Sequence, residues 1–180
     1  MPWDALQAFF TDERAVPPAD PLSNYRIANA SLSKLRPERV HRLRGEAGDL
    51  AAEAARAAAD LRATLGTPPR LDLMLLGLGP DGHILSLFAG VPHTRGDDEL
   101  VRAVAAPTQV EPHVARLTLT PFLVVTARMV VLQVTGAKKA AVLARALKDP
   151  EDPTACPAQW LRRASGRVVI VADAEAASGL

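Results

Sequence analysis

Apolar and polar positions follow two different periods along the chain, and each period predicts a different kind of element. From 45 to 66, leucine and alanine recur every three or four residues until Gly66 ends the pattern, which predicts an amphipathic helix. Residues 71–77 (LDLMLLG) are almost continuously apolar and of strand length. That run is typical of a parallel strand covered on both faces.

Shorter segments extend this alternation along the rest of the sequence. Strands are predicted at 6–10, 115–120, 129–136 and 167–173, and helices at 23–32, 121–128, 137–148 and 157–164. Ser23 is placed to cap the first of these helices by accepting a backbone N–H bond. Strands that alternate with helices predict an α/β fold with a largely parallel sheet.

Composition narrows the class of protein without naming a substrate. The 180 residues suit one domain, 1–180, and 48% hydrophobic with 23% charged residues is typical of a globular protein. A net charge of +1 gives no reason to expect nucleic acid as a partner. The lone Cys156 excludes an intrachain disulfide, and no apolar run approaches membrane-spanning length. The sequence therefore predicts a cytoplasmic protein without membrane contact.

The loop that follows 71–77, GLGPDGHI, lies where ligands bind in an open α/β sheet, beyond the carboxyl end of a strand. Its glycines allow a close approach of the backbone to a ligand. Asp81 can cap a helix that begins near Gly82, which would place His83 in the first turn, where the helix dipole favours neutral imidazole. A simple turn with a packed histidine explains this loop equally well.

Four segments, 11–28, 71–90, 116–120 and 134–143, together resemble the signature segments of the 6-phosphogluconolactonase family. They read TDERAVPPADPLSNYRIA, LDLMLLGLGPDGHILSLFAG, RLTLT and VTGAKKAAVL. The resemblance implies a three-layer α/β fold, a mostly parallel sheet with helices on both faces, shared with glucosamine-6-phosphate deaminases and ribose-5-phosphate isomerases. It also implies hydrolysis of 6-phospho-D-glucono-1,5-lactone in the pentose phosphate pathway, with no cofactor and no metal.

The same resemblance makes His83 the catalytic histidine, a general base that returns its proton to the ring oxygen. Asp81 is expected either to orient His83 or to cap a turn. Backbone N–H groups of the glycine loop, around Gly79 and Gly82, are candidates for contacts with the substrate's developing oxyanion. Asp12 matches an active-site acid that positions the histidine or a water.

Phosphate binding is expected from basic side chains at two further places. Arg14 has a planar charged fork suited to phosphate, and the family uses this arginine as a substrate ligand. Lys138 and Lys139 follow a predicted strand, where the resemblance gives one of them a phosphate contact; Lys139 fits the GxxKA pattern better, and a surface lysine pair is the alternative. Glu13 is interpreted as a solvated acid.

Weaker candidates complete the predicted site. Asn24 and Tyr25 resemble a segment that lines the family's pocket, although a helix cap with a packed tyrosine explains them nearly as well. Arg116 is a further candidate for substrate contact. The other histidines, His41, His93 and His113, are predicted to lie on the surface, because they lack metal-ligand spacing.

Family members usually begin earlier, with a strand, a helix and a GGxTP-like loop that helps to bind phosphate. The chain is therefore expected to be an N-terminally truncated lactonase domain, either because its true start lies upstream or because it is a natural remnant. It is expected to act as a monomer or weak homo-oligomer on a small sugar phosphate.

Three alternatives stay open at this point. A sugar-phosphate deaminase or isomerase is disfavoured, because the deaminases follow the histidine with a segment like AFNEP. Here ILSLFAG follows, with no acid until Asp97. A noncatalytic sugar-phosphate-binding remnant is the second alternative. A nucleotide-binding domain ranks last, since GLGPDG lacks the G-x-G-x-x-G spacing.

Overall fold

The structure is a computed structural model that describes residues 3–93, 96 and 98–180. The chain folds as two compact units. Unit 1 comprises residues 1–64 and 101–119, and unit 2 comprises residues 65–100 and 120–180. The expected α/β class is confirmed, because both units combine helices with sheets, while the expectation of a single domain stays a prediction.

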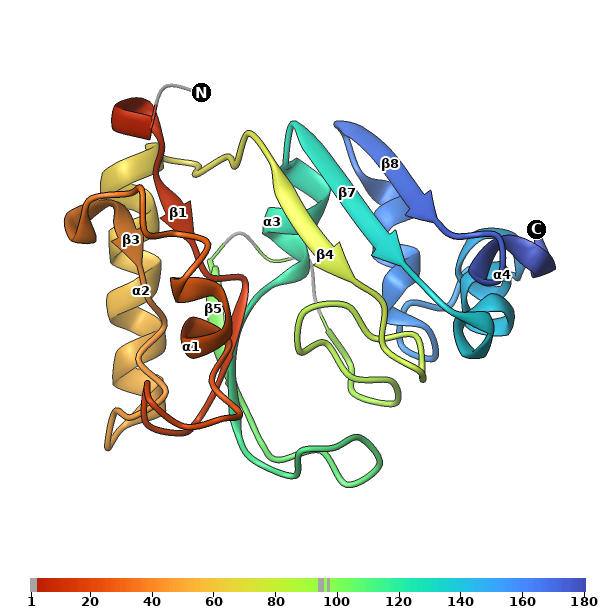
Figure 1. The fold of residues 1–180 in the computed structure, drawn as a ribbon, viewed down its shortest axis with the longest axis horizontal. Coiled ribbons are helices and arrows are strands. Elements are labelled where there is room, and N and C mark those ends of the chain that lie inside the picture. The colour runs from red at the N-terminus through yellow and green to blue at the C-terminus, as the bar shows by residue number, and fades with distance from the viewer. Residues whose placement is uncertain (1–2, 94–95, 97) are drawn as a thin grey trace. The chain divides into compact units, whose positions relative to one another are not determined.

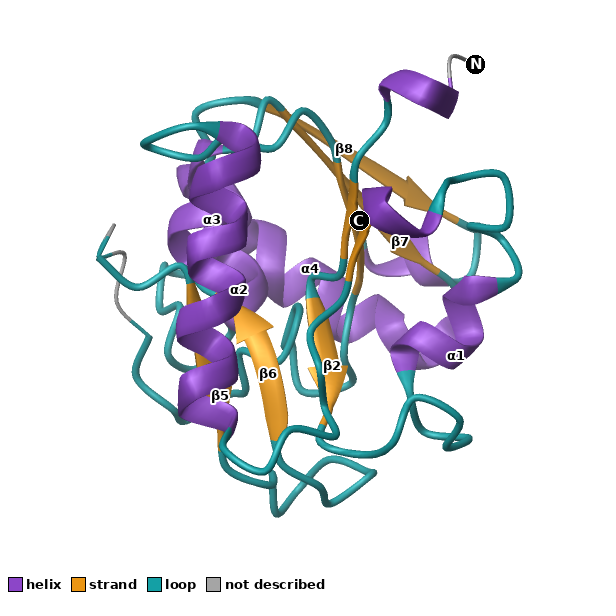
Figure 2. Cartoon of the chain, turned by 90° about the vertical axis from the view of Figure 1, so that its left-hand side faces the viewer, coloured by secondary structure: helices purple, strands orange, loops and turns teal. Residues whose placement is uncertain are grey.

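The described residues of unit 1 form two small sheets and two α-helices. β1 (Ala8–Phe9) pairs in parallel with β3 (Val40–His41). An antiparallel sheet has the order β2 (Asp12–Arg14), β6 (Arg116–Leu119), β5 (Val101–Val104), as Figure 2 shows. The helices are α1 (Asn24–Asn29) and α2 (Leu50–Leu65), and short 3-10 helices span Trp3–Ala5 and Pro37–Arg39.

Local sequence explains where both helices of unit 1 begin and end. The hydroxyl of Ser23 accepts a hydrogen bond from the backbone N–H of Arg26 at 3.2 Å, which confirms the predicted cap of α1. Gly66 has a φ of +86°, a conformation that favours glycine and ends α2 where the sequence predicts. The apolar face of α2 is buried, including Ala57 and Leu61.

Unit 2 is built on a parallel sheet with the order β4 (Met74–Gly77), β7 (Met129–Val134), β8 (Arg167–Ala172), which runs diagonally in Figure 1. Its α-helices are α3 (Pro121–Thr126) and α4 (Ala140–Lys148). Three 3-10 helices span Ala137–Lys139, Pro157–Arg163 and Ala176–Gly179. Side chains from the middle of this sheet and from both helices, such as Leu132, Leu123 and Leu143, are fully buried and form the core.

The structure differs from the predicted elements in several places. Strands β2, β3 and β5 are not predicted by the sequence pattern, and β6 pairs in an antiparallel rather than a parallel sheet. The segment 157–164 forms a 3-10 helix. No helix begins near Gly82, where residues 80–90 form turns and an isolated bridge instead.

The expectation that 71–77 is covered on both faces is wrong. Met74 and Leu76 are buried, whereas Leu75 between them is 67% exposed. Neighbouring strands place Val131 and Val169 in register with Leu75. Leu75, Val131 and Val169 therefore lie on the less covered face of the sheet. Within the described part of the chain, no helix is long and apolar enough to cross a bilayer.

We predict that the two faces of this sheet contribute very differently to stability. Leu132→Ala removes a fully buried side chain from the central strand β7 and should lower the free energy of unfolding by about 3 kcal/mol. Leu75→Ala on the exposed face should lower it by less than about 1 kcal/mol. Urea denaturation followed by circular dichroism measures both, and equal losses would contradict this assignment of the core.

Candidate active site

The loop after β4 closes on itself through its own backbone. The N–H of Gly79 donates to the carbonyl of His83 at 2.8 Å, and the N–H of Gly82 donates to the carbonyl of Gly79 at 3.2 Å. A Cβ on Gly79 would lie 2.0 Å from Nδ1 of His83, so only glycine lets the imidazole lie against this backbone. Both N–H groups proposed for the oxyanion are thus used within the loop, and their contacts with substrate stay a prediction.

Asp81 holds the imidazole of His83 directly. Its Oδ1 lies 2.5 Å from Nδ1 of His83 and also accepts the backbone N–H of His83 at 3.1 Å. The ring meets Phe88 edge-on, with centroids 5.1 Å apart. A carboxylate oxygen can only accept, so Nδ1 carries the proton and Nε2 is the basic nitrogen of the neutral ring. The structure contains both contacts expected for Asp81, the one that orients the imidazole and the one that caps the turn.

The electrostatics of this pair are set by partial burial and by the imidazole. Burial raises the pKa of Asp81, but the hydrogen bond and charge of His83, together with backbone donors, outweigh it and lower the pKa to about 2. Asp81 is therefore ionised throughout the physiological range. Because no helix begins at Gly82, the helix dipole expected to favour neutral imidazole at His83 is absent, and the orientation of the ring comes from this carboxylate.

The two lysines after β7 have different surroundings in the structure. Nζ of Lys139 donates to the carbonyl of Leu78 at 2.7 Å, which places its ammonium beside the histidine loop. Burial lowers the pKa of Lys139, and the charge of Asp81 opposes that shift. Lys138 is exposed. Both lysines lie in the 3-10 helix Ala137–Lys139, since α4 begins only at Ala140.

The backbone donors at the start of this turn are already occupied. The N–H of Gly136 donates to the carboxylate of Asp173 at 2.9 Å, and the N–H of Ala137 donates to Glu175 at 3.2 Å. Two acids thus occupy the place expected for an anion at a helix start. The N–H groups of Gly136 and Ala137 are therefore already used by acids of this chain.

Arg145 of α4 is a support for the loop that sequence reasoning missed. Its Nη2 donates to the carbonyl of Asp81. A Cβ on Gly82, whose φ is +96°, would lie 2.8 Å both from that Nη2 and from Sγ of Cys156. The guanidinium therefore packs directly under the turn that carries His83. No motif marks it, because the contact joins residues 64 positions apart.

In unit 1, the predicted residues of β2 and α1 lie together. Nδ2 of Asn24 donates to the backbone carbonyl of Asp12 at 2.9 Å and to its Oδ1 at 3.1 Å. Arg14 is in register with Arg116 on the neighbouring strand β6. Nη1 of Arg14 donates to the carbonyl of Leu22 at 2.7 Å. Asp12, Asn24, Arg14 and Arg116 therefore form one cluster.

The facing arginines make this cluster favourable for an anion. Burial lowers the pKa of Arg116, and the charge of Arg14 lowers it further, against the opposing charges of Asp12 and Glu13. Like charges directly opposite each other on paired strands are unfavourable unless something neutralises them. The guanidinium of Arg116 also donates to the carbonyls of Val114 and Pro112 at 3.0 and 2.7 Å, which holds it in place.

Tyr25 packs within unit 1. Its ring lies 5.8 Å from that of Phe10, and the guanidinium of Arg42 lies 4.2 Å from its centroid. These contacts correspond to the packed tyrosine that the sequence allowed as an alternative, and a role for Tyr25 in lining a substrate pocket stays a prediction.

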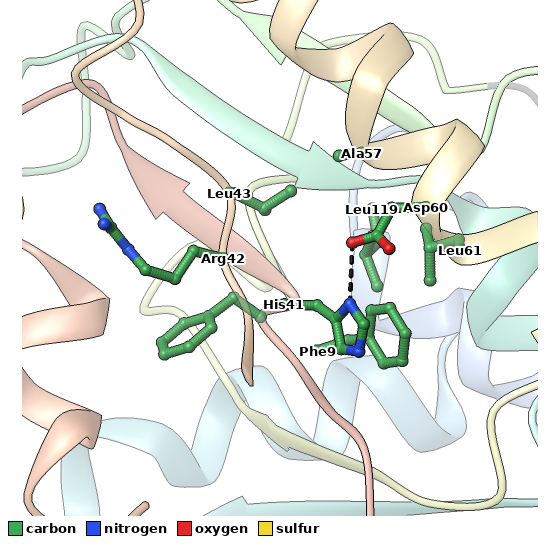
Figure 3. Close-up of a pocket in the computed structure, with 9 residues that line it drawn as sticks. Phe9, His41, Arg42, Leu43, Ala57, Asp60, Leu61 and Leu119 are labelled. Carbon is green, nitrogen blue, oxygen red and sulfur yellow. Dashed lines mark hydrogen bonds and ion pairs between the residues drawn. The ribbon is translucent and has the colours of Figure 1, made fainter. Parts of the chain in front are cut away.

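The histidines expected on the surface are not all there. His93 is buried, and His41 is held between Asp60 and Gln7 at 2.8 and 2.9 Å while it stacks on Phe9. Figure 3 shows His41 directed at Asp60 of α2 beside a cavity of about 10 Å³, which is too small for a sugar phosphate. The side chain of His113 is half-exposed, as expected. Asp97 lies outside the described residues.

The fold and the histidine loop together define a class of protein. It is an α/β protein in which a carboxylate holds a histidine in a loop beyond a parallel strand. The family model for glucosamine-6-phosphate isomerases/6-phosphogluconolactonase matches residues 1–170. The chain therefore belongs to this family.

Individual relatives agree with this placement. The 6-phosphogluconolactonase of Treponema pallidum is 32% identical, over 92% of this chain and 70% of the relative. That of Synechocystis sp. is 33% identical, over 100% of this chain and 75% of the relative. The solved 6-phosphogluconolactonase of Trypanosoma brucei is 30% identical, with a TM-score of 0.84 over 98% of this chain and 75% of that one.

The hydrogen-bonded contact of Asp81 with His83 predicts a defined pH dependence of stability. The folded-state pKa of Asp81, about 2, lies below its ordinary 3.8, so its contribution is present above pH 3.8 and is lost as the pH falls toward 2. Asp81→Asn should therefore be less stable than the unmodified chain by about 2 kcal/mol near neutral pH. Urea titrations from pH 3 to 7 should show this gap narrow below about pH 4. A gap that stays constant or widens on acidification would refute the pairing.

Proposed function

We propose that this chain hydrolyses 6-phospho-D-glucono-1,5-lactone to 6-phospho-D-gluconate. The observation that carries the proposal is the contact of Asp81 with Nδ1 of His83, which leaves Nε2 as a base at the end of β4. The naming of the relatives as 6-phosphogluconolactonases supports the choice of substrate. The reaction belongs to the pentose phosphate pathway, and the chain acts as a carboxylic ester hydrolase.

In this proposal, Nε2 of His83 removes a proton from a water molecule as its oxygen attacks the lactone carbonyl carbon. The carbonyl electrons move onto oxygen to form a tetrahedral intermediate. When the carbonyl re-forms, the bond between that carbon and the ring oxygen breaks, and His83 returns the proton to the ring oxygen. The products are the carboxylic acid and the freed hydroxyl, and Asp81 stabilises the imidazolium during the cycle.

The substrate's phosphate requires cations, and the candidates are Arg14 and Arg116 in unit 1 and, separately, Lys139 in unit 2. The facing arginines are a like-charge pair that an anion would relieve. Lys139 has its ammonium beside the histidine loop, whereas Lys138 is exposed. Asp12 and Asn24 are proposed to hold the sugar or a water through their mutually bonded polar groups.

A deaminase within the same family is disfavoured by the sequence that follows the histidine. Residues 84–90, ILSLFAG, contain no acid to assist ring opening. The cytoplasmic location and the monomeric or weakly oligomeric state expected from the sequence stay predictions, as does the absence of a nucleic-acid partner.

Replacing the base should remove the activity without removing the fold. His83→Ala is expected to lower kcat by about 10²- to 10⁴-fold, because the attacking water then lacks its proton acceptor. The measurement is the initial rate with freshly generated lactone, corrected for spontaneous hydrolysis. His41→Gln is the matched histidine control and should retain kcat, since His41 contacts Gln7, Phe9 and Asp60 rather than the proposed site. A near-normal rate for His83→Ala would exclude this histidine as the base.

The two adjacent lysines provide a second, internally controlled test. Lys139→Ala should raise KM by about tenfold with a smaller effect on kcat, because a phosphate contact of the bound substrate is lost. Lys138→Ala removes the same charge one residue away and should leave KM within about twofold. Steady-state kinetics of both variants decide the point. Equal effects, or a larger effect at Lys138, would reverse the assignment.

A further inference from the structure

Glu13 lies between two predicted site residues, Asp12 and Arg14, and is only 1% exposed. The sequence interpretation of Glu13 as a solvated acid is therefore wrong. Glutamate is almost never fully buried unless its carboxylate is paired or hydrogen-bonded. The hydrogen-bond partners of Glu13 therefore explain how its carboxylate can be buried.

Four donors converge on the two carboxylate oxygens of Glu13. Oε1 accepts the backbone N–H groups of Arg14 and Asn24, both at 2.7 Å. Oε2 accepts the backbone N–H of Tyr25 at 2.8 Å and the hydroxyl of Ser23 at 3.0 Å. A single side chain thus binds its neighbour on β2 and three consecutive residues at the start of α1.

These bonds fix the backbone from which the substrate-binding side chains project. The N–H groups of Asn24 and Tyr25 lie in the first turn of α1 and have no partner within the helix. With the backbone of Asn24 held by Glu13, its amide reaches Asp12. With the N–H of Arg14 also held, the guanidinium reaches the carbonyl of Leu22. Every contact of Glu13 is therefore with, or next to, a predicted substrate-binding residue.

We propose that Glu13 is a positioning residue for substrate binding, which acts through Arg14 and Asn24 without touching the substrate. This inference rests on the proposed lactonase function. Glutamine in its place keeps the shape but offers one acceptor oxygen, and its NH₂ group would face backbone N–H donors. Glu13→Gln should therefore displace the segment that carries both side chains.

Glu53 offers a matched control within unit 1. It is 5% exposed and accepts the backbone N–H of Arg44 at 2.9 Å and Nη2 of Arg56 at 2.7 Å. It is a similarly buried carboxylate, although it is paired with the side chain of Arg56, and its bonds go to neither Arg14 nor Asn24. Glu53→Gln therefore separates the general cost of neutralising a buried carboxylate from an effect on binding.

The experiment compares thermal unfolding and steady-state lactone hydrolysis for the unmodified chain, Glu13→Gln and Glu53→Gln, at a temperature at which all three are folded. Both variants should have a lower Tm. Glu13→Gln alone should raise KM by about tenfold with kcat within about threefold, while Glu53→Gln keeps KM within about twofold. Two variants with lowered Tm and unchanged KM would overturn the positioning role and leave the lactonase assignment intact. An unmodified chain that does not hydrolyse the lactone would instead refute the proposed function.

A double-mutant comparison distinguishes action through Arg14 from a diffuse effect. If Glu13 works by placing that guanidinium, its substitution should add little to the rise in KM already caused by Arg14→Ala. Fully multiplicative effects on KM would contradict the proposal. Should Glu13→Gln not fold, Ser23→Ala removes one of the four donors and should raise KM by a smaller factor of about threefold. No change of KM in that variant would count against the proposal.

Discussion

The proposed chemistry of this chain depends on one short contact, that of the Asp81 carboxylate with Nδ1 of His83. The contact exists because the loop after β4 folds back on itself, which requires a residue without Cβ at position 79. Arg145 of α4 supports the same turn from beneath by binding the carbonyl of Asp81. The parallel sheet thus provides a rigid strand end, the loop provides the geometry, and the carboxylate selects the imidazole nitrogen that remains basic.

A carboxylate that accepts several hydrogen bonds also occurs in unit 1, where it holds different kinds of side chain. There the buried carboxylate of Glu13 organises a strand end and a helix start, and the side chains it places are an arginine and an asparagine rather than a base. In both units a carboxylate holds a loop or a helix start in place by accepting several hydrogen bonds at once. Proteins rely on this arrangement because preorganised groups need no rearrangement when the substrate binds.

The sequence predicted those parts of the fold that depend on local pattern. Long apolar runs predicted β4, β7 and β8, and helical spacing predicted α2. Ser23 predicted the N-terminal cap of α1. Strands β2 and β3 have only three and two residues and lie outside any apolar run, so no hydrophobic period marks them. The burial of Glu13 and the role of Arg145 could not be predicted because all of their partners except Arg14 lie 10 to 64 positions away. His83 and Asp81 were singled out because glycine, acid and histidine stand together in one loop, and the family resemblance then made His83 the candidate base.

The most direct test of the account is the rate at which the 180-residue chain consumes freshly prepared 6-phospho-D-glucono-1,5-lactone. Consumption should be faster than the spontaneous reaction, proportional to protein concentration and saturable with substrate, with 6-phospho-D-gluconate as the product. A rate equal to spontaneous hydrolysis at every protein concentration, from a chain that circular dichroism shows to be folded, would contradict it.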